Sequence, residues 1–410
     1  MYYSLKRATF WNVVGYVYLV IAALISTPIL VGYMGLYQFG QYSLILATSY
    51  LVSSIDFGLS QSVVRALSRD HKFSVRRQTL WATSSILFIL TGLLAGVIAV
   101  VIVYNFHISS VLLPLIFCLC LISSVVAHYT TLPQAEGHFG YFNAKTFIVG
   151  TANTLLAAYL AWHGFGILRI ISALILSYLL TMIVLVFFAL KFFPHPRDGK
   201  PSLSVAKSLL SFGLKNQAGK IVGQAQAQYG KYLLATLSPL ILSAYVIAGG
   251  LVQKLVGGVV QVATAFYPAS ARSGYQKSTR RIYYRIQLGL FILGLAFIGL
   301  YQLFGLPFLT WWLGEAKLVA SVHSFLLVYR YYGLLLLLAP MASTMLDGLG
   351  HPGITSIFAT VAFAIELVVA IILLPQFGLL APAYAGLVAI ILTTPPLLYV
   401  TEKTMLKSTL

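Results

Sequence analysis

The run LWATSSILFILTGLLAGVIAVVIVY at residues 80–104 decides the class of fold. It contains no charged side chain and exceeds the roughly 20 apolar residues that a helix needs to cross a bilayer. Comparable runs recur along the whole chain of 410 residues, which is 60% hydrophobic and 8% charged. We therefore predict an all-α polytopic membrane protein with twelve transmembrane helices. The expected spans are 8–32, 40–64, 80–104, 110–132, 145–163, 168–191, 208–236, 240–268, 284–306, 322–345, 352–375 and 377–400.

The basic side chains predict how these spans are oriented. Most of the 26 Lys and Arg residues fall in every second loop and near the two termini, whereas the remaining loops hold only Arg169 and Lys317. Cytoplasmic loops carry an excess of Lys and Arg. We therefore predict that both termini lie in the cytoplasm.

The two halves of the sequence resemble each other. The segment AEGHFG at 135–140 resembles GLGHPG at 348–353, and each segment is followed by one predicted span. Two six-span halves with the same orientation indicate a parallel repeat, with a substrate site between the repeats. We predict an N-terminal lobe over 1–192, a cytoplasmic linker over 193–207 and a C-terminal lobe over 208–410, with a central cavity.

Several short motifs resemble the polysaccharide-biosynthesis branch of the MOP superfamily of exporters, to which the MATE exporters also belong. The motifs are TP at 27–28, GYMG at 32–35, FGQY at 39–42, DFGL at 56–59, GLGHP at 348–352 and PQFGL at 375–379. The resemblance covers essentially the whole chain and agrees with two lobes of six spans. It implies a flippase of the O-antigen (Wzx) type. Such proteins move an undecaprenyl-diphosphate-linked oligosaccharide from the cytoplasmic to the outer leaflet of the bacterial inner membrane.

The resemblance also implies the partners of the protein. They are a lipid-linked oligosaccharide, membrane lipids, H⁺ or Na⁺ as a coupling ion, and the polymerase or glycosyltransferase machinery of surface polysaccharides such as the O-antigen of lipopolysaccharide. The two additional C-terminal spans typical of lipid II flippases are not expected here, which counts against the assignment of this chain as a lipid II flippase. We expect a monomer that is not an enzyme and needs no cofactor. The net charge of +18 lies mostly in loops on one side, so we expect no binding to nucleic acid.

Five basic residues fall inside the predicted spans, where a cation costs roughly 2.5–3.5 kcal/mol at the bilayer centre. A hydrated cavity that receives an anionic diphosphate and its sugars would explain them. Lys220 and Lys254 lie deepest, whereas Lys215 and Arg330 could equally snorkel to the interface. Asn12 lines the cavity or makes a packed hydrogen bond between helices. The candidate cavity residues are Lys220, Lys254, Lys231, Lys215, Gln224, Gln228, Arg330 and Asn12.

Two acidic residues fall inside the spans and are candidates for ion coupling or gating. Glu366 lies in the middle of the eleventh span, with no basic residue nearby on its own helix. It is either a proton or sodium site or a permanent counter-ion for a buried lysine. Asp56 lies near the inner end of the second span. It could serve in ion coupling, cap a helix, or pair with Arg65 or Arg69.

The sequence also favours transport over other classes of function. An ion-coupled multidrug exporter of the MATE type would need carboxylates in its cavity to attract organic cations, and the buried charge has the opposite sign. A polysaccharide polymerase or ligase would need a long outer loop with catalytic residues, and the outer loops are short. Cys118 and Cys120 face different directions on one helix and have no ligand partner at suitable spacing, so we expect neither a disulfide nor a metal site.

Overall fold

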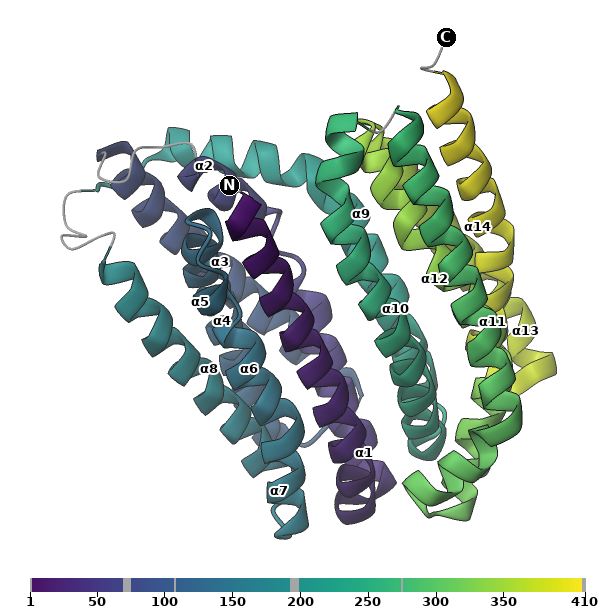
Figure 1. Ribbon diagram of the computed structural model, residues 1–410. Helices are drawn as coiled ribbons and strands as arrows, with labels where there is room; N and C mark the ends of the chain where they lie inside the picture. The colour runs from purple at the N-terminus through teal and green to yellow at the C-terminus, as the bar shows by residue number, and fades with distance from the viewer. Residues whose placement is uncertain (1, 69–74, 107, 192–198, 274–275, 408–410) are drawn as a thin grey trace. The chain divides into compact units, whose positions relative to one another are not determined.

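The computed structural model describes residues 2–68, 75–106, 108–191, 199–273 and 276–407 (Figure 1). Nearly all of this described chain is helical, and it contains no strand. It divides into two units, Met1–Gln228 and Tyr229–Leu410. The division falls inside one long helix, α9, whose first turns pack against the first unit. The predicted lobe limits of 1–192 and 208–410 stay a prediction.

The first unit contains the N-terminal helices. They are α1 (Tyr2–Ser53), α2 (Leu59–Leu67), α3 (Val75–Asn105), η1 (Ser110–Leu112), α4 (Leu113–Ala135), α5 (Phe139–Phe142), α6 (Ala144–Thr151), the π-helical turn η2 (Ala152–Leu156), α7 (Ala157–Trp162), α8 (Ile167–Leu190) and the beginning of α9 (Leu203–Ala235). Helix α9 thus begins inside the predicted linker 193–207.

Glycine residues shape the first two spans. At Gly35 the backbone of α1 leaves the helical region with φ 73° and ψ 162°, so this helix contains the first span and most of the second. A positive φ of this kind suits glycine, which has no Cβ to clash. The second span is interrupted after Ser53, and the chain turns through Phe57 (φ 51°) and Gly58 (φ 70°) before α2 begins. The predicted span 40–64 is therefore shared between two helices.

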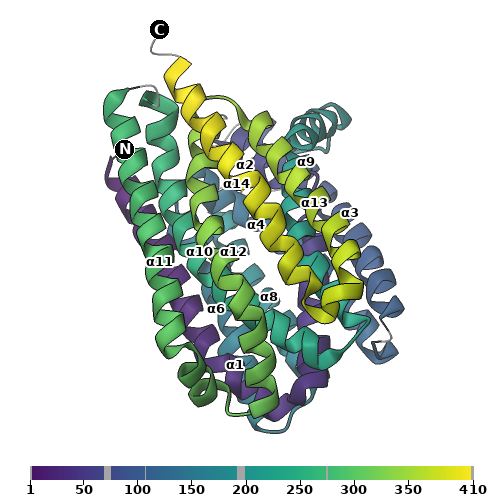
Figure 2. The ribbon, with the colours of Figure 1, turned by 90° about the vertical axis from the view of Figure 1, so that its right-hand side faces the viewer.

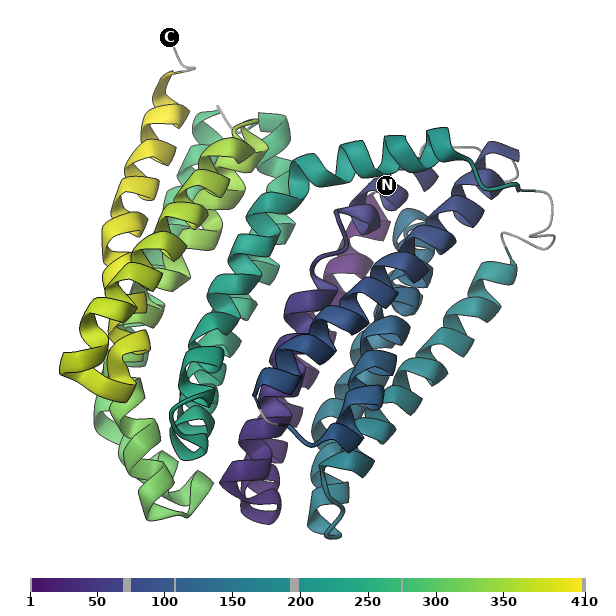
Figure 3. The ribbon, with the colours of Figure 1, turned by 180° about the vertical axis from the view of Figure 1, so that it is seen from behind.

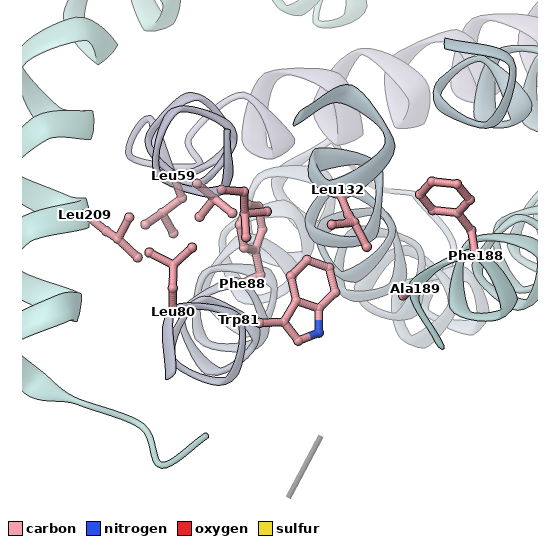
Figure 4. Packing of buried hydrophobic residues seen from close by; sticks show 10 residues of the cluster. Leu59, Leu80, Trp81, Phe88, Leu132, Phe188, Ala189 and Leu209 are labelled. Atoms are coloured by element: carbon pink, nitrogen blue, oxygen red, sulfur yellow. The ribbon is translucent and has the colours of Figure 1, made fainter. Parts of the chain in front are cut away.

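A buried apolar cluster holds α2, α3, α4, α8 and α9 together at one end of the first unit (Figure 4). Leu59 and Phe88 are completely buried in it, and Trp81 is 8% exposed. Leu209 brings α9 into the same cluster. Figure 3 shows this part of α9 lying across the ends of α2 and α3. Between membrane-spanning helices, such side chains stabilise the unit mainly through van der Waals packing.

The second unit is built around the helix α12 (Ala316–Gly348). The unit also contains the end of α9, α10 (Pro239–Ser273), α11 (Lys277–Leu313), α13 (Pro352–Phe377), η3 (Gly378–Leu380) and α14 (Ala381–Lys407). Met341 and Met345 of α12 are completely buried and pack against residues of α10, α11 and α14. Figure 2 shows α13 and α14 side by side.

The structure confirms an all-α polytopic protein. Eight segments of the described chain are long and apolar enough to cross a membrane. Two of these are long enough for two spans: Pro352–Leu406 contains the predicted spans 352–375 and 377–400, and Val14–Ser53 contains most of 8–32 and more than half of 40–64. The remaining two spans lie in α9, which is more polar, and in the consecutive short pieces α6, η2 and α7. Together these helices account for the twelve predicted spans.

The ends of α4 and α12 are built alike, as the predicted repeat requires. After α4, Gly137 has φ 74°, and the His138 amide donates to the Pro133 carbonyl at 2.8 Å. After α12, Gly350 has φ 90°, and the His351 amide donates to the Leu346 carbonyl at 2.9 Å. This is the Schellman arrangement, in which a left-handed glycine lets the next amide satisfy a carbonyl of the last helical turn.

Candidate functional site

A buried carboxyl group lies on α13 in the second unit. Glu366 of α13 is only 5% exposed. Helix α14 passes close to it at Gly386, where an added Cβ would lie 3.0 Å from Oε1 of Glu366. Any side chain at Gly386 would therefore press on the carboxyl group.

Four tyrosines from three other helices surround this carboxyl group, and we call them the tyrosine cluster. They are Tyr229 of α9, Tyr245 of α10, and Tyr329 and Tyr332 of α12. Tyr229 packs against Phe363 of α13, one helical turn before Glu366, with ring centroids 5.9 Å apart. The rings of Tyr245 and Tyr329 have centroids 6.0 Å apart. A Cβ added at Gly386 would lie 3.4 Å from the ring of Tyr332 as well as 3.0 Å from Oε1 of Glu366. The cluster is packed, with ring centroids of Tyr329 and Tyr332 5.6 Å apart.

The chemistry of this arrangement follows from its burial. An ionised carboxylate is costly to bury unless hydrogen bonds or a counter-charge compensate it. Phenol hydroxyls supply such hydrogen bonds, and they are also oxygen ligands for a hard cation. A carboxyl group in this setting can hold a proton or help to bind a cation. No group of three or more His, Cys, Asp or Glu side chains with metal-ligand geometry occurs among the described residues.

The first unit contains a related but neutral arrangement. The buried Tyr42 hydroxyl donates to Oδ1 of Asn153 and lies 3.0 Å from the Asn153 backbone carbonyl. The Asn153 amide in turn donates to the Tyr50 hydroxyl at 3.2 Å. Asn153 lies in the π-helical turn η2, a distortion often found at functional positions.

These two sites occupy corresponding positions of the repeat. Asn153 precedes Glu366 by the same number of residues that separates Gly140 from Gly353. Tyr42 and Tyr245 likewise stand near the start of the second span of their respective halves. Each half therefore brings a tyrosine of its second span toward a polar residue of its fifth span. Sequence reasoning named Glu366 but missed Asn153 and the tyrosine cluster, although the repeat alignment could have found Asn153.

The predicted cavity residues that are described lie mainly on α9 and α10. Gln224 is exposed, while Gln228 is 7% exposed and its Oε1 accepts no hydrogen bond within the described chain. Lys231 is partly buried, and no carboxylate of the described chain lies within ion-pair distance of it. Lys254 is partly buried, and its Nζ donates to the Gly250 carbonyl at 3.4 Å. The side chains of Lys215, Lys220 and Asn12 lie outside the described residues.

Arg330 and Asp56 have well-defined partners in the structure. The Arg330 guanidinium donates to the Gln302 side chain on α11 and to the Tyr331 hydroxyl at 3.1 Å. Asp56 accepts the Gly58 amide at 2.9 Å, and the Ser60 amide at 3.2 Å and hydroxyl at 2.6 Å. Its carboxylate therefore caps the beginning of α2, where unsatisfied amides and the helix dipole favour a negative group.

Solved structures of MOP superfamily transporters have a similar fold. The lipid II flippase MurJ in an inward closed conformation matches with a TM-score of 0.73 and 14% identity, over 98% of this chain and 89% of that one. An inward-facing MATE multidrug transporter matches with a TM-score of 0.68 and 14% identity, over 97% and 95%. A MOP superfamily transporter from Pyrococcus furiosus, described as having a binding pocket of reverse polarity, matches with a TM-score of 0.67 and 15% identity, over 98% and 95%.

The family follows from the sequence match. The family model described as polysaccharide biosynthesis protein matches residues 5–274, and the chain belongs to this family. The resemblance deduced from the short motifs is thereby confirmed. No curated protein matches the sequence.

Proposed function

We propose that this protein flips an undecaprenyl-diphosphate-linked oligosaccharide, an O-antigen or related repeat unit, across the bacterial inner membrane. The observation that carries this proposal is the combination of family and fold. A polysaccharide-biosynthesis match covers residues 5–274, and a transporter fold extends over nearly the whole chain. A transporter in polysaccharide biosynthesis needs a substrate that must cross a membrane, and a lipid-linked sugar is such a substrate.

The charges in the membrane-spanning helices support a substrate with an anionic headgroup. Lys231 and Lys254 are partly buried on α9 and α10, and Lys231 has no carboxylate partner within the described residues. A buried cation without a compensating anion is unfavourable. A diphosphate would supply that anion, while the amides of Gln224 and Gln228 would bind sugar hydroxyls. Lys215, Lys220, Arg330 and Asn12 belong to the same proposed cavity.

We further propose that Glu366 couples transport to a proton or sodium gradient. Its burial among tyrosine hydroxyls supports this role, because binding or loss of a cation changes the charge of the packed interior. The tyrosine cluster brings together α9, α10, α12 and α13 around one titratable group. A change of charge there would alter how these helices pack. Asp56 caps α2, so we assign the coupling to Glu366 in preference to Asp56.

Transport would occur by alternating access. Two lobes, 1–192 and 208–410, would rock about a central cavity and open it first to the cytoplasm and then outside. The polyprenyl tail would remain in lipid while the headgroup crosses. Both termini would lie in the cytoplasm. The protein would act as a monomer alongside the polymerase and glycosyltransferases, and it would break no covalent bond of its substrate.

A reconstitution experiment tests this function. Proteoliposomes that contain the purified chain would receive a fluorescent polyprenyl-diphosphate oligosaccharide, and its access to an external quencher would be followed. We expect faster transbilayer movement of the diphosphate lipid than in protein-free vesicles. The MATE neighbours favour one other function, export of organic cations, so uptake of ethidium is measured in parallel. Transport of ethidium without movement of the lipid would overturn the proposal.

A further inference from the structure

The first unit contains a pocket whose lining includes none of the residues of the proposed transport cavity. It has a volume of about 490 Å³ and lies where α2, α3 and the first turns of α9 meet. Small-molecule sites typically occupy about 300–1,000 Å³, so the pocket can hold a phosphorylated headgroup. It is found at the end of the unit that the charge distribution of the loops predicts to face the cytoplasm.

Two arginines give the pocket a positive wall. Arg65 of α2 and Arg76 of α3 line it, both with exposed side chains, and none of the lining residues is acidic. The Arg65 guanidinium stacks on the Phe212 ring, with Cζ 4.1 Å from the ring centroid. Stacking fixes the plane of the guanidinium and so pre-orients its donors. Arginine binds phosphate oxygens bidentately, which makes this wall suitable for a phosphate group.

The beginning of α9 adds donors to the opposite wall. Ser204 and Val205 belong to the first turn of α9, and with Ser208 they line the pocket. The first amides of a helix have no acceptor within the helix, and the helix dipole there favours an anion. The Ser202 amide donates to Oγ1 of Thr83 at 3.0 Å, which anchors this helix end on α3.

The floor of the pocket is held by close contacts between α2 and α9. The buried Ser62 hydroxyl lies 2.9 Å from the Leu209 carbonyl. An added Cβ at Gly58 would collide with the backbone of Gly213, so the two segments touch with no side chain between them. Contacts of this kind keep the pocket formed without a ligand, and a preformed site loses less entropy on binding.

Exposed apolar side chains lie further along α3. Leu90, Leu94, Val97 and Val101 follow one another at steps of three and four residues, so they share one face of the helix. All four side chains are between 46% and 56% exposed. This face begins fourteen residues after Arg76, and Thr83 between them is buried. Because α3 is apolar enough to cross a membrane from Val75 onward, the pocket at its beginning lies near the level of the lipid headgroups.

We propose that this pocket binds the phosphate of an anionic lipid headgroup at the membrane surface. Two lipids present that chemistry: an anionic phospholipid of the bilayer, and the diphosphate of a lipid-linked sugar before it enters the transport cavity. Binding in this pocket does not require that the protein flips its ligand. An experiment can therefore disprove the binding site without disproving the proposed transport function, and the reverse.

Lipid binding to the purified full-length chain in detergent tests the site. Native mass spectrometry would measure the affinities of phosphatidylglycerol, phosphatidylcholine and undecaprenyl diphosphate. In the double variant Arg65→Gln/Arg76→Gln we expect the affinity for the anionic lipid to fall by about tenfold or more, as loss of charge-assisted hydrogen bonds implies. The matched control is Lys200→Gln/Lys207→Gln, which removes the same charge from exposed residues outside the pocket. We expect less than about a threefold change there.

The outcomes of these measurements distinguish between the two lipids, and two of the possible outcomes would disprove the proposed site. Tight binding of phosphatidylglycerol that depends on the two arginines assigns the pocket to a membrane phospholipid. Arginine-dependent binding of undecaprenyl diphosphate alone assigns it to the transport substrate. Ser208→Asp, which places a negative charge in the wall, should weaken binding without removing either arginine. Equal losses in the pocket and control variants, or binding of phosphatidylglycerol and undecaprenyl diphosphate that does not depend on the two arginines, would overturn the proposal.

Discussion

The buried hydroxyl of Tyr42 donates a hydrogen bond to the side chain of Asn153, which lies in a π-helical turn of the fifth span. The corresponding position of the second half holds Glu366, which lies beside Tyr229 and Tyr332 of the tyrosine cluster. The two halves thus share a polar contact between spans. In the first half this contact is neutral, and in the second it contains a titratable group.

The Tyr42–Asn153 pair is expected to be structural. Asn153→Leu should leave the Tyr42 hydroxyl buried without its side-chain acceptor and destabilise the protein by about 1–3 kcal/mol. Adding Tyr42→Phe to this variant should cost little more, since the hydrogen bond between the two side chains is already lost. Thermal unfolding in detergent measures both effects, with Tyr33→Phe as a control because Tyr33 is 59% exposed. Strictly additive losses for the two substitutions would contradict the pairing.

Glu366 should couple transport to an ion gradient. In Glu366→Gln the side chain keeps its size, an amide NH2 replaces one carboxyl oxygen, and the group can no longer change charge. We expect transport of the diphosphate lipid to lose its response to an imposed proton or sodium gradient. Glu315→Gln is the matched control, because Glu315 is exposed at the beginning of α12. A gradient response that persists in Glu366→Gln would remove the coupling role.

Lys231 should contribute to recognition of the substrate. Lys231→Gln removes a partly buried cation that has no carboxylate partner in the described chain. We expect at least about a tenfold lower affinity for the diphosphate lipid, since a hydrogen bond to a charged group contributes about 1.5–3 kcal/mol. Binding of a neutral polyprenol oligosaccharide should not change. The exposed Lys403 provides the control substitution Lys403→Gln, and an equal loss there would point to a nonspecific charge effect.

The ion pair of Arg77 and Glu136 should stabilise the first unit. Arg77 is 1% exposed and Glu136 is 7% exposed, and the two side chains form a salt bridge between α3 and the end of α4. Glu136→Gln would leave a buried cation without its counter-charge, which costs about 3–5 kcal/mol. Replacing both residues, in Arg77→Met/Glu136→Leu, should restore part of the loss. Thermal unfolding measures the series, and a single variant as stable as the wild type would refute the prediction.

The contact between α2 and α9 should tolerate no side chain. Gly213→Ala would push a Cβ into the carbonyl of Phe57, and we expect a clear loss of stability, on the order of 1–3 kcal/mol. Gly140→Ala provides a control, because nothing lies within 4 Å of the Cβ it would add. Unfolding of the purified variants tests this, and similar stabilities for the two would show that α9 can move away from α2.

The positions of the spans were predictable because hydropathy is a local property of the sequence. Runs such as residues 80–104 can satisfy their backbone in lipid only as helices. The details of the second span were less predictable. The helix α1 ends after Ser53 because the chain turns at Phe57 and Gly58. The polar residues around this turn did not clearly predict that the helix would end there. The interpretation of Asp56 also stayed open until its hydrogen bonds with Gly58 and Ser60 identified it as a cap.

The sequence by itself determined the all-helical membrane fold, the charge bias of the loops, the repeat and the family resemblance. Each of these follows from residue types at short or regular spacing. Only the tertiary structure decided what surrounds Glu366, which residue Tyr42 contacts, and that Arg65, Arg76 and the beginning of α9 enclose one pocket. The partners of these residues are far apart in the chain, and helix packing brings them together. Local patterns carry no information about such contacts, because the same apolar face can pack against several different helices.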